Sequence, residues 1–381
     1  MSMRNLFDTP VDRLQTASQK WDRYQGQDIL PMWVADTDFR APQAVMDALH
    51  QRISHGVFGY TLAPESLNQT IIERMARLYD WQIEADWIVY LPGLVCGLNV
   101  ATRSLASEGA GVITPVPVYP PFMSSVLLSK RKLLKTPMLL IDGRWQLDLD
   151  ELRRQAADAE LLLLCNPHNP GGTVYTRDEL EAIRAVAEEF QLTVCSDDIH
   201  CDLLLDEDAK HVPFASLNDD AAQRTVTLMA PSKTFNIAGL ACSFAIIPNP
   251  ELRQKFIRAK RGIVPDINLL GYTAAEAAYR DGDEWLSAQL DYLRGNRDRL
   301  QQAIAGMPGL SLAHIEATYL AWIDASELQL DCPHQFFEKA GVGLSPGRDF
   351  GAPSFIRLNF GCTHATLEQA IKRMQVALAE R

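Results

Sequence analysis

The stretch "TLMAPSKTFNIAGLACSFAII", residues Thr227–Ile247, decides how the rest of the sequence is interpreted. Apolar runs at both of its ends predict buried strands, and a single lysine, Lys233, lies in the turn between them. A lysine at a strand end in a water-poor rim loses hydration, and this loss lowers its pKa. Such a lysine is suited to nucleophilic chemistry through a Schiff base.

Short apolar runs before and after this stretch predict a sheet. They span residues 87–91, 111–116, 131–139, 160–166, 192–197, 225–230 and 242–247. Near-continuous leucine-rich and β-branched runs are typical of strands buried on both faces, as in a parallel sheet covered by helices. Helical patterns alternate with them, and one begins with a capping-box signature, Thr176 to Glu179. The predicted fold class is therefore α/β, with a mostly parallel seven-stranded sheet.

The pattern changes at about residue 281. A long amphipathic helix is expected from there to the Pro308-Gly309 turn, followed by short strands at 310–316, 318–324 and 355–360. The first 45 residues show no sheet pattern and are expected to pack against this C-terminal part. We therefore predict a large domain at 46–280 and a small α+β domain made of residues 1–45 and 281–381.

Composition excludes several classes of protein. The 381 residues carry a formal net charge of −12, with a pI near 5.2, so no basic surplus exists for nucleic acid or a membrane surface. Seven cysteines without a C-x-x-C pair suit a reducing compartment.

No run approaches the roughly 20 apolar residues that span a bilayer, and the N-terminus lacks the apolar core of a signal peptide. We expect a cytoplasmic location. The Cys195, His200 and Cys201 spacing matches no usual zinc site, so no metal is expected.

Chemically useful groups follow the predicted strands. In open α/β sheets ligands bind beyond the carboxyl ends of the strands, so these groups are expected at one rim. They are a glycine turn that opens a helix, an aromatic ring, an amide, a carboxylate and the lysine, namely Gly93, Tyr119, Asn169, Asp197 and Lys233. Each group alone has a plain structural reading, such as a turn or a helix cap. The combination is more specific than any part.

The order Gly93, Tyr119, Asn169-Pro170, Asp197, Ser232-Lys233 and Arg357 resembles the fold-type I pyridoxal-phosphate enzymes of the class I/II aminotransferase superfamily. The resemblance covers essentially the whole chain. The segments "PMWVADTDF" (31–39), "GYT" (59–61), "CNPHNPGG" (165–172), "SDDIHCDL" (196–203) and "SKTFNIAGL" (232–240) are more similar to its C–S lyase branch, the cystathionine β-lyases of the MalY/PatB type. The resemblance implies an aspartate-aminotransferase-like fold and the cofactor pyridoxal 5'-phosphate.

The resemblance also implies roles for individual residues. Lys233 would carry the cofactor as a Schiff base and act as acid and base, with Tyr119 and Tyr60 as further catalytic residues. Asp197 would pair with the pyridinium nitrogen, Asn169 would bond the ring oxygen, and Tyr119 would stack on the ring. The remaining cofactor contacts would come from Gly93, Leu94, Val95, Ser232, His200 and Tyr60. Arg357 would clamp the substrate α-carboxylate, and Trp33 and Tyr119 would wall the substrate. Tyr60 would reach over from the partner subunit, which requires a homodimer with sites at the interface.

Four positions depart from the wider superfamily. His200 replaces a tyrosine, Ala241 a phosphate-binding arginine, Ala230 a serine, and Gly171 the threonine of the usual Asn-Pro-Thr-Gly motif. His200 fits the lyase branch. The missing arginine leaves open how the phosphate is held.

These features lead to a functional hypothesis with two alternatives. We expect a lyase that cleaves the C–S bond of L-cystathionine or related S-substituted cysteines by α,β-elimination, giving a thiol, pyruvate and ammonia. An aminotransferase would use the same residues, and a regulatory protein on the same fold is a third reading. The shared motifs do not separate lyase from aminotransferase. Resemblance at "PMWVADTDF" and "DDIH" favours the lyase.

Overall fold

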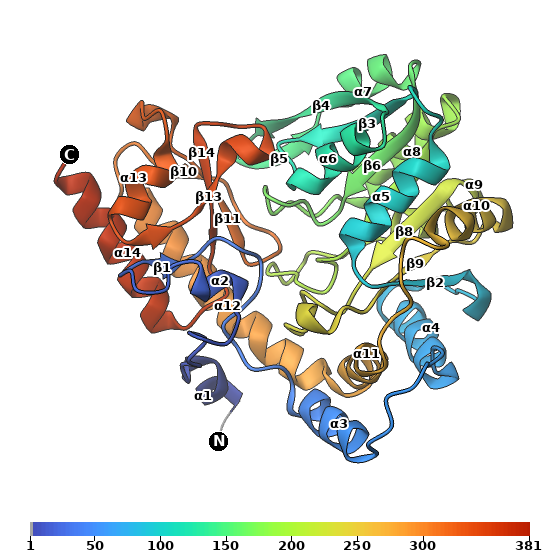
Figure 1. Cartoon of the computed structure of the whole chain (residues 1–381). Helices are drawn as coiled ribbons and strands as arrows, with labels where there is room; N and C mark the ends of the chain where they lie inside the picture. Colours follow the sequence, from blue (N-terminus) through green and yellow to red (C-terminus); the bar gives the residue numbers. More distant parts are fainter. Residues whose placement is uncertain (1–2) are drawn as a thin grey trace.

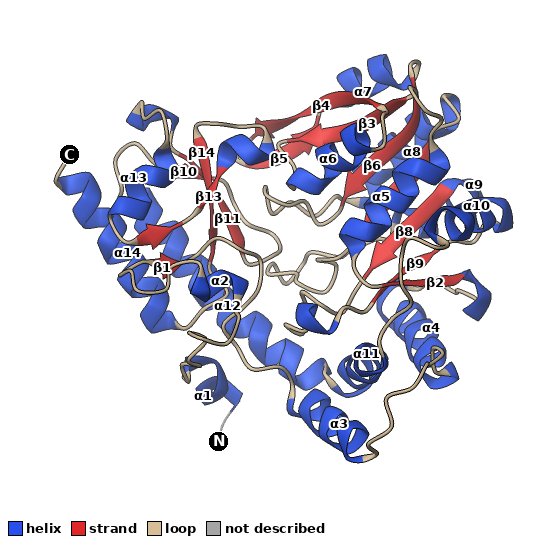
Figure 2. Cartoon of the chain, in the orientation of Figure 1, coloured by secondary structure: helices blue, strands red, loops and turns tan. Residues whose placement is uncertain are grey.

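A computed structural model describes residues 3–381 of the chain, and its centre is an eight-stranded sheet (Figures 1 and 2). The strand order is β2-β9-β8-β7-β6-β3-β4-β5. The strands are β2 (Ile88–Leu91), β3 (Gly111–Val116), β4 (Lys132–Ile141), β5 (Arg144–Leu147), β6 (Ala159–Cys165), β7 (Thr193–Asp197), β8 (Thr225–Met229) and β9 (Ser243–Ile246). Neighbours from β8 to β4 are parallel, whereas β9 is antiparallel to both β2 and β8. The α/β class and the mostly parallel sheet are confirmed.

All seven predicted strands are present, and β5 is an eighth that the sequence analysis did not predict. It pairs antiparallel with β4 across a two-residue turn, Asp142-Gly143, in which both residues have positive φ (50° and 79°). An Asp-Gly turn between two short runs is a hairpin signal. β5 has only four residues and its side chains alternate in burial, so it lacks the apolar run that identified the other strands.

Helices cover both faces of the sheet, as expected for near-continuous apolar strands (Figure 2). Strand β6 shows why, because its leucines alternate between two apolar clusters. Leu161 and Leu163 pack with α5 (Leu94–Leu105), α6 (Pro120–Leu128) and α10 (Pro250–Lys260). Leu162 and Leu164 pack with α7 (Leu149–Ala156), α8 (Arg177–Glu189) and α9 (Asp219–Arg224). The predicted capping box of Thr176 and Glu179 starts α8.

A second, four-stranded sheet in the order β10-β11-β14-β13 lies in the C-terminal part. Its strands are β10 (Ser311–Leu312), β11 (Leu320–Asp324), β13 (Ser345–Pro346) and β14 (Phe355–Asn359). The helices beside it are α12 (Asp283–Ala305), α13 (Pro333–Lys339) and α14 (His364–Ala379). The predicted long helix corresponds to α12 and the three predicted strands to β10, β11 and β14. The domain limits at 46–280 and 281–381 stay a prediction.

The N-terminal segment lies beside this C-terminal part (Figure 1). It contains α1 (Met3–Asp8), α2 (Gln19–Asp22) and β1 (Leu30–Pro31), and Phe7 packs its ring 5.5 Å from that of Trp285 on α12. Strand β1 pairs parallel with β12 (Val342–Gly343), so the first 45 residues do contribute to a sheet, contrary to expectation. A two-residue strand is too short to leave a pattern in the sequence. The remaining helices are α3 (Gln43–Ser54), α4 (Glu65–Tyr79) and α11 (Leu269–Asp281). None of the helices in residues 3–381 has the length and apolarity needed to cross a membrane.

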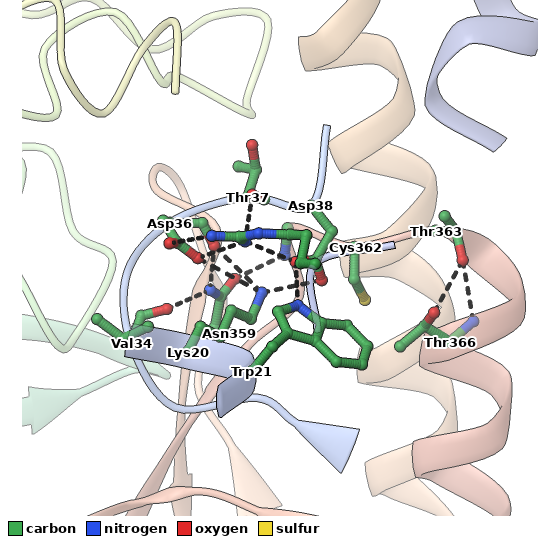
Figure 3. Close-up of polar contacts among 12 residues, drawn as sticks. Lys20, Trp21, Val34, Asp36, Thr37, Asp38, Asn359, Cys362, Thr363 and Thr366 are labelled. Carbon is green, nitrogen blue, oxygen red and sulfur yellow. Dashed lines mark hydrogen bonds and ion pairs between the residues drawn. The ribbon is translucent and has the colours of Figure 1, made fainter. Parts of the chain in front are cut away.

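A buried charge cluster anchors the segment that follows β1 (Figure 3). Lys20, only 1% exposed, donates to a carboxylate oxygen of Asp38 at 3.0 Å, and Trp21 donates its indole N–H to the same carboxylate at 2.8 Å. Arg13 pairs with both Asp36 and Asp38 at 2.8 Å. Two cations and two anions thus neutralise one another around residues 36–38. Moving one member of a buried ion pair away from its partner leaves an uncompensated charge, which is costly. The cluster therefore keeps the segment in place.

Replacing Lys20 with methionine tests this anchor. The substitution keeps the length of the side chain but removes one of the two cations paired with Asp38, which keeps Arg13 at 2.8 Å, so we expect the free energy of unfolding to fall by about 1–3 kcal/mol. Urea unfolding followed by circular dichroism measures the change. Lys130→Met is the matched control, because Lys130 is largely exposed and meets Glu108 only at 3.6 Å, and its expected change is below about 0.5 kcal/mol. Equal stability of the two variants would contradict a buried anchor.

Candidate active site

The topology of the sheet brings the predicted rim groups to one edge. Strand β2 is antiparallel to β9, which is antiparallel to β8, so β2 points the same way as β8 and the other parallel strands. The carboxyl ends of β2, β3, β6, β7 and β8 therefore meet at the same edge. Gly93, Tyr119, Asn169, Asp197 and Lys233 follow or end these strands. Direct contacts join some of them, since the Tyr119 N–H donates to the Asn169 carbonyl at 3.0 Å.

Lys233 lies in the turn after β8, and its Nζ donates to the carbonyl oxygen of Ala35 at 2.6 Å. Burial, opposed by Asp36 and Asp197 and reinforced by Arg357, lowers the pKa of Lys233 to about 8. The lowered pKa was predicted from the position of Lys233 at a strand end. At a pH near 8 the amine is thus available both as a proton acceptor and as a nucleophile.

Asp197 ends β7 as a buried carboxylate. One of its oxygens accepts from the Ile199 N–H at 3.2 Å, and within residues 3–381 no cationic side chain forms an ion pair with it. Burial raises the pKa of Asp197 to about 7, with the neighbouring Asp198 contributing to the rise and the Ile199 N–H and Lys233 opposing it. A buried carboxylate without a counter-ion fits a ligand that brings a cationic N–H group.

Arg357 is the complementary case, a buried guanidinium without a carboxylate partner in the described part of the chain. It lies on β14, the strand between β11 and β13, and donates to the Asn169 side-chain oxygen at 2.9 Å and to the Trp33 carbonyl at 3.0 Å. Its Cζ lies 4.7 Å from the centre of the Phe350 ring. Burial lowers the pKa of Arg357 to about 10, and its Nε has no hydrogen-bond partner. A ligand carboxylate would neutralise this group.

His200 is buried close to both cations. Burial, together with the charges of Lys233 and Arg357, lowers the pKa of His200 to about 3, so the imidazole is neutral. Its Nδ1 has no hydrogen-bond partner, and its ring stands edge-on to Tyr319 with centroids 6.2 Å apart. A neutral imidazole with an unused nitrogen fits a polar atom of a bound ligand.

The glycine turn opens a helix as predicted. Gly93 is the N-cap of the 12-residue α5 and provides no side-chain cap, so the first N–H groups of the helix, beginning at Leu94 and Val95, are available to an anion. Tyr119 is the N-cap of α6, whose first two residues are prolines without N–H groups, and burial raises the pKa of its phenol. Ser232 is partly buried beside Lys233. Ala241, at the position of the missing arginine, has left-handed backbone (φ 52°).

Within a single chain, the rings of two predicted site residues, Trp33 and Tyr60, do not reach the site. The Trp33 indole donates to the Lys20 carbonyl at 3.2 Å and stacks 4.5 Å from the Arg23 guanidinium, so it faces α2, and its carbonyl is what contacts Arg357. Tyr60 is fully exposed, at 113% of the reference area, on the extended segment between α3 and α4.

The sequence analysis singled out residues 31–39 by resemblance and Trp33 as a substrate wall, but it did not predict that the backbone of this segment closes the site from the other side. Side chains from distant parts of the chain donate to every carbonyl from Trp33 to Thr37. Arg357 and Ser345 donate to the carbonyl of Trp33, and Asn359 donates to that of Val34. Lys233 and Tyr319 donate to the carbonyl of Ala35. Asn359 and Lys20 donate to that of Asp36, and Arg13 and Asn236 to that of Thr37. The two aspartates in "ADTDF" are the only trace of this arrangement that the sequence displays. Backbone acceptors leave no signature of their own.

The departure at Gly171 has a steric cause. A Cβ added there would lie 2.8 Å from the His168 Nδ1 and 3.0 Å from the Trp145 ring. The Gly171 N–H donates to that same His168 nitrogen at 3.2 Å. The threonine of the wider superfamily therefore does not fit beside His168 and Trp145, and the second of these lies on β5, the strand that was not predicted.

Comparisons with known proteins agree with this geometry. The model of the family described as aminotransferase class I and II matches residues 28–374. Cystathionine beta-lyase PatB of Bacillus subtilis (strain 168) is 38% identical, over 98% of this chain and all of the relative. A solved structure of a protein named OvoB is 52% identical, with a TM-score of 0.97 over 98% of this chain and 99% of that one. Cystalysin from Treponema denticola, which contains pyridoxal 5'-phosphate, is 31% identical, with a TM-score of 0.94 over 98% of both chains.

The unpaired carboxylate of Asp197 leads to a prediction for the cofactor-free chain. Between its ordinary value of 3.8 and about 7, the folded chain keeps a proton on Asp197 that the unfolded chain has released. The contribution of this group to stability therefore falls as the pH rises through that window. We expect Asp197→Asn to raise the free energy of unfolding, and to raise it by about 2 kcal/mol more at pH 8 than at pH 5.

Urea unfolding at the two pH values measures this difference. Asp158→Asn serves as the control, since Asp158 is exposed, and its effect is expected to stay within about 0.5 kcal/mol at both pH values. The same gain from Asp197→Asn at pH 5 and pH 8 would show that Asp197 is not an unpaired buried carboxylate.

Proposed function

The chain belongs to the class I and II aminotransferase family and, within it, to the C–S lyase branch, and from this premise we propose that it cleaves the C–S bond of L-cystathionine or related S-substituted cysteines. The chain is a lyase that depends on pyridoxal 5'-phosphate and releases a thiol, pyruvate and ammonia. The observation that carries the site assignment is the pair of buried charges without partners, Asp197 and Arg357, near a lysine of lowered pKa.

The residues at the rim fit the cofactor. When bound, pyridoxal 5'-phosphate withdraws electrons from the α-carbon of an amino acid. The carboxylate of Asp197 would hold the pyridine N–H, and the amide N–H of Asn169, whose oxygen accepts from Arg357, would bond the ring oxygen. The N-terminus of α5 would bind the phosphate with Ser232, without the arginine that Ala241 replaces. His200 adds a neutral nitrogen and Tyr119 an aromatic face.

Lys233 would move the proton at the substrate α-carbon. With its pKa lowered to about 8, the amine accepts a proton near neutral pH more readily than a solvated lysine, of which almost none is unprotonated. The Ala35 carbonyl, 2.6 Å away, would stabilise the ammonium group that this proton transfer creates. The protein thus provides the base and a fixed acceptor for its charged form.

Arg357 would orient the substrate. Its guanidinium is held by Asn169, by the Trp33 carbonyl and by the face of Phe350, so its remaining N–H groups have a fixed direction. A bidentate contact to the α-carboxylate would place the Cα–H bond toward Lys233 and leave the sulfur substituent to point elsewhere. Elimination rather than amino transfer is supported by the relatives named cystathionine beta-lyase.

We also propose that two chains form a homodimer that completes each site. The extended segment between α3 and α4 exposes four large apolar or aromatic side chains, namely Val57 (61%), Phe58 (59%), Tyr60 (113%) and Leu62 (88%). Such a row of exposed residues is unusual on a monomer and favours a surface covered by another chain. A second copy would bury this row and bring Tyr60 to the phosphate and the substrate of its neighbour.

The activity is tested with L-cystathionine. We expect pyruvate and a free thiol in equal amounts, and a protein that takes up added pyridoxal 5'-phosphate with a visible absorbance that borohydride removes. Lys233→Ala is expected to lose at least about a thousandfold in rate, because it lacks both the attachment point and the base. Lys130→Ala, an exposed lysine, is the control and is expected to keep full activity.

The alternative functions give different results in the same assay. Transfer of the amino group to 2-oxoglutarate without release of a thiol would show that the protein is an aminotransferase and not a lyase. A protein that takes up no added cofactor would overturn the enzyme assignment altogether.

The dimer is tested by mixing two inactive variants. If Tyr60 acts on the partner's site, a hybrid of Tyr60→Ala and Lys233→Ala chains has one site with both defects and one intact site. Random exchange of subunits is then expected to restore about a quarter of the wild-type activity. No recovery, in a mixture shown by mass spectrometry to contain hybrids, would place Tyr60 outside the partner's site.

A further inference from the structure

Tyr319 shares the acceptor of the catalytic lysine. Its hydroxyl donates to the Ala35 carbonyl oxygen at 3.1 Å, and Lys233 donates to the same oxygen at 2.6 Å. The Tyr319 side chain is fully buried, and burial raises the pKa of its phenol above the ordinary value, so it stays a neutral donor. The carbonyl therefore faces two donors, one of which becomes positively charged when Lys233 takes up a proton.

The backbone before Tyr319 is strained in a way that fixes this contact. Thr318 has φ of +75°, and a β-branched residue rarely adopts this left-handed backbone. Its N–H donates to the Leu203 carbonyl at 2.8 Å, while the Tyr319 carbonyl accepts from the Phe360 N–H at 2.9 Å. The chain thus passes from a contact with the loop after β7 into β11 within two residues. Strained backbone of this kind persists where its surroundings over-determine it, and it often marks functional sites.

We propose that Tyr319 is a positioning residue that shares the Ala35 carbonyl with Lys233 and thereby limits the affinity of the lysine amine for protons. The positive end of the Tyr319 O–H dipole points at the Ala35 carbonyl oxygen. Without Tyr319, this oxygen would accept a hydrogen bond from the Lys233 ammonium group alone. Ammonium is therefore stabilised less than it would be by an unshared carbonyl, and more of the amine stays unprotonated at neutral pH. This inference rests on the proposed role of Lys233.

Other charges face Lys233 from every side and set the background for this effect. Asp36 comes from the segment after β1, Asp197 from β7 and Arg357 from β14, and the neutral His200 follows β7. None of these groups has a hydrogen bond to the Tyr319 hydroxyl in the part of the chain that the structure describes. Removing the hydroxyl should therefore leave them in place and change only the sharing of the carbonyl.

The test measures the titration of Lys233 in the cofactor-free protein. Acetic anhydride labels only unprotonated amines, so labelling across pH 6–10, quantified by mass spectrometry of the Lys233 peptide, gives its midpoint. In the wild-type chain we expect a midpoint near 8. Tyr319→Phe is expected to raise it by about half a pH unit or more, which is about a threefold loss of free amine at pH 7. 3-Fluorotyrosine at position 319, a stronger donor than tyrosine that keeps its proton when buried, is expected to lower it.

Tyr175→Phe is the matched control. Tyr175 is also buried, and its hydroxyl donates to the Met138 sulfur at 3.5 Å in a separate apolar cluster. Its loss of a hydroxyl should leave the Lys233 midpoint unchanged. A midpoint that stays fixed or falls in Tyr319→Phe would overturn the proposal. If circular dichroism shows that Tyr319→Phe does not fold, the fluorinated variant serves as the test. An unchanged or raised Lys233 midpoint in that variant would also contradict the proposal. The lyase assignment is independent of either result.

Discussion

The site depends on one stretch of irregular backbone, the five residues from Trp33 to Thr37, and on the side chains that hold its carbonyls. Irregular backbone inside a protein must find partners for its polar groups, because unpaired buried carbonyls are costly. Here the partners are largely cationic or amide side chains, among them Lys20, Arg357 and Asn359. The segment therefore collects positive charge, and the acids at 36 and 38 offset part of it. Lys233 and Arg357 owe their fixed positions to this arrangement.

The large sheet provides the other half of the site, and its logic is simpler. Parallel strands end at one edge, so whatever follows them converges there. Two opposite charges, Asp197 and Arg357, are left buried without partners in the described chain, which is unfavourable for the empty protein and favourable for a zwitterionic or dipolar ligand. The site thus gives up stability that binding restores. This balance is common where chemistry requires groups to be ready before the ligand arrives.

The sequence predicted most of the large sheet and little of the irregular segment from Trp33 to Thr37. Long apolar runs identified seven strands, and their ends identified Asp197 and Lys233, because strand burial and strand direction follow from local pattern. The hairpin strand β5 and the pair β1–β12 were missed, since two to four residues produce no period. The roles of Ala35 and Tyr319 were missed for a different reason. A backbone carbonyl has no sequence signature, and a tyrosine before a strand looks like any core aromatic.

The segment from Trp33 to Thr37 also has a consequence for how the chain folds. Its donors include Asn359, 325 residues from Val34, and Tyr319, 284 residues from Ala35, so several of its contacts have very large sequence separation. Contacts of this kind form late, because the loops that they close carry the largest entropic cost. During synthesis the large sheet can form before the donors on β14 have been added, whereas the candidate site must wait until Asn359 is present. Its assembly therefore reports that synthesis has passed β14.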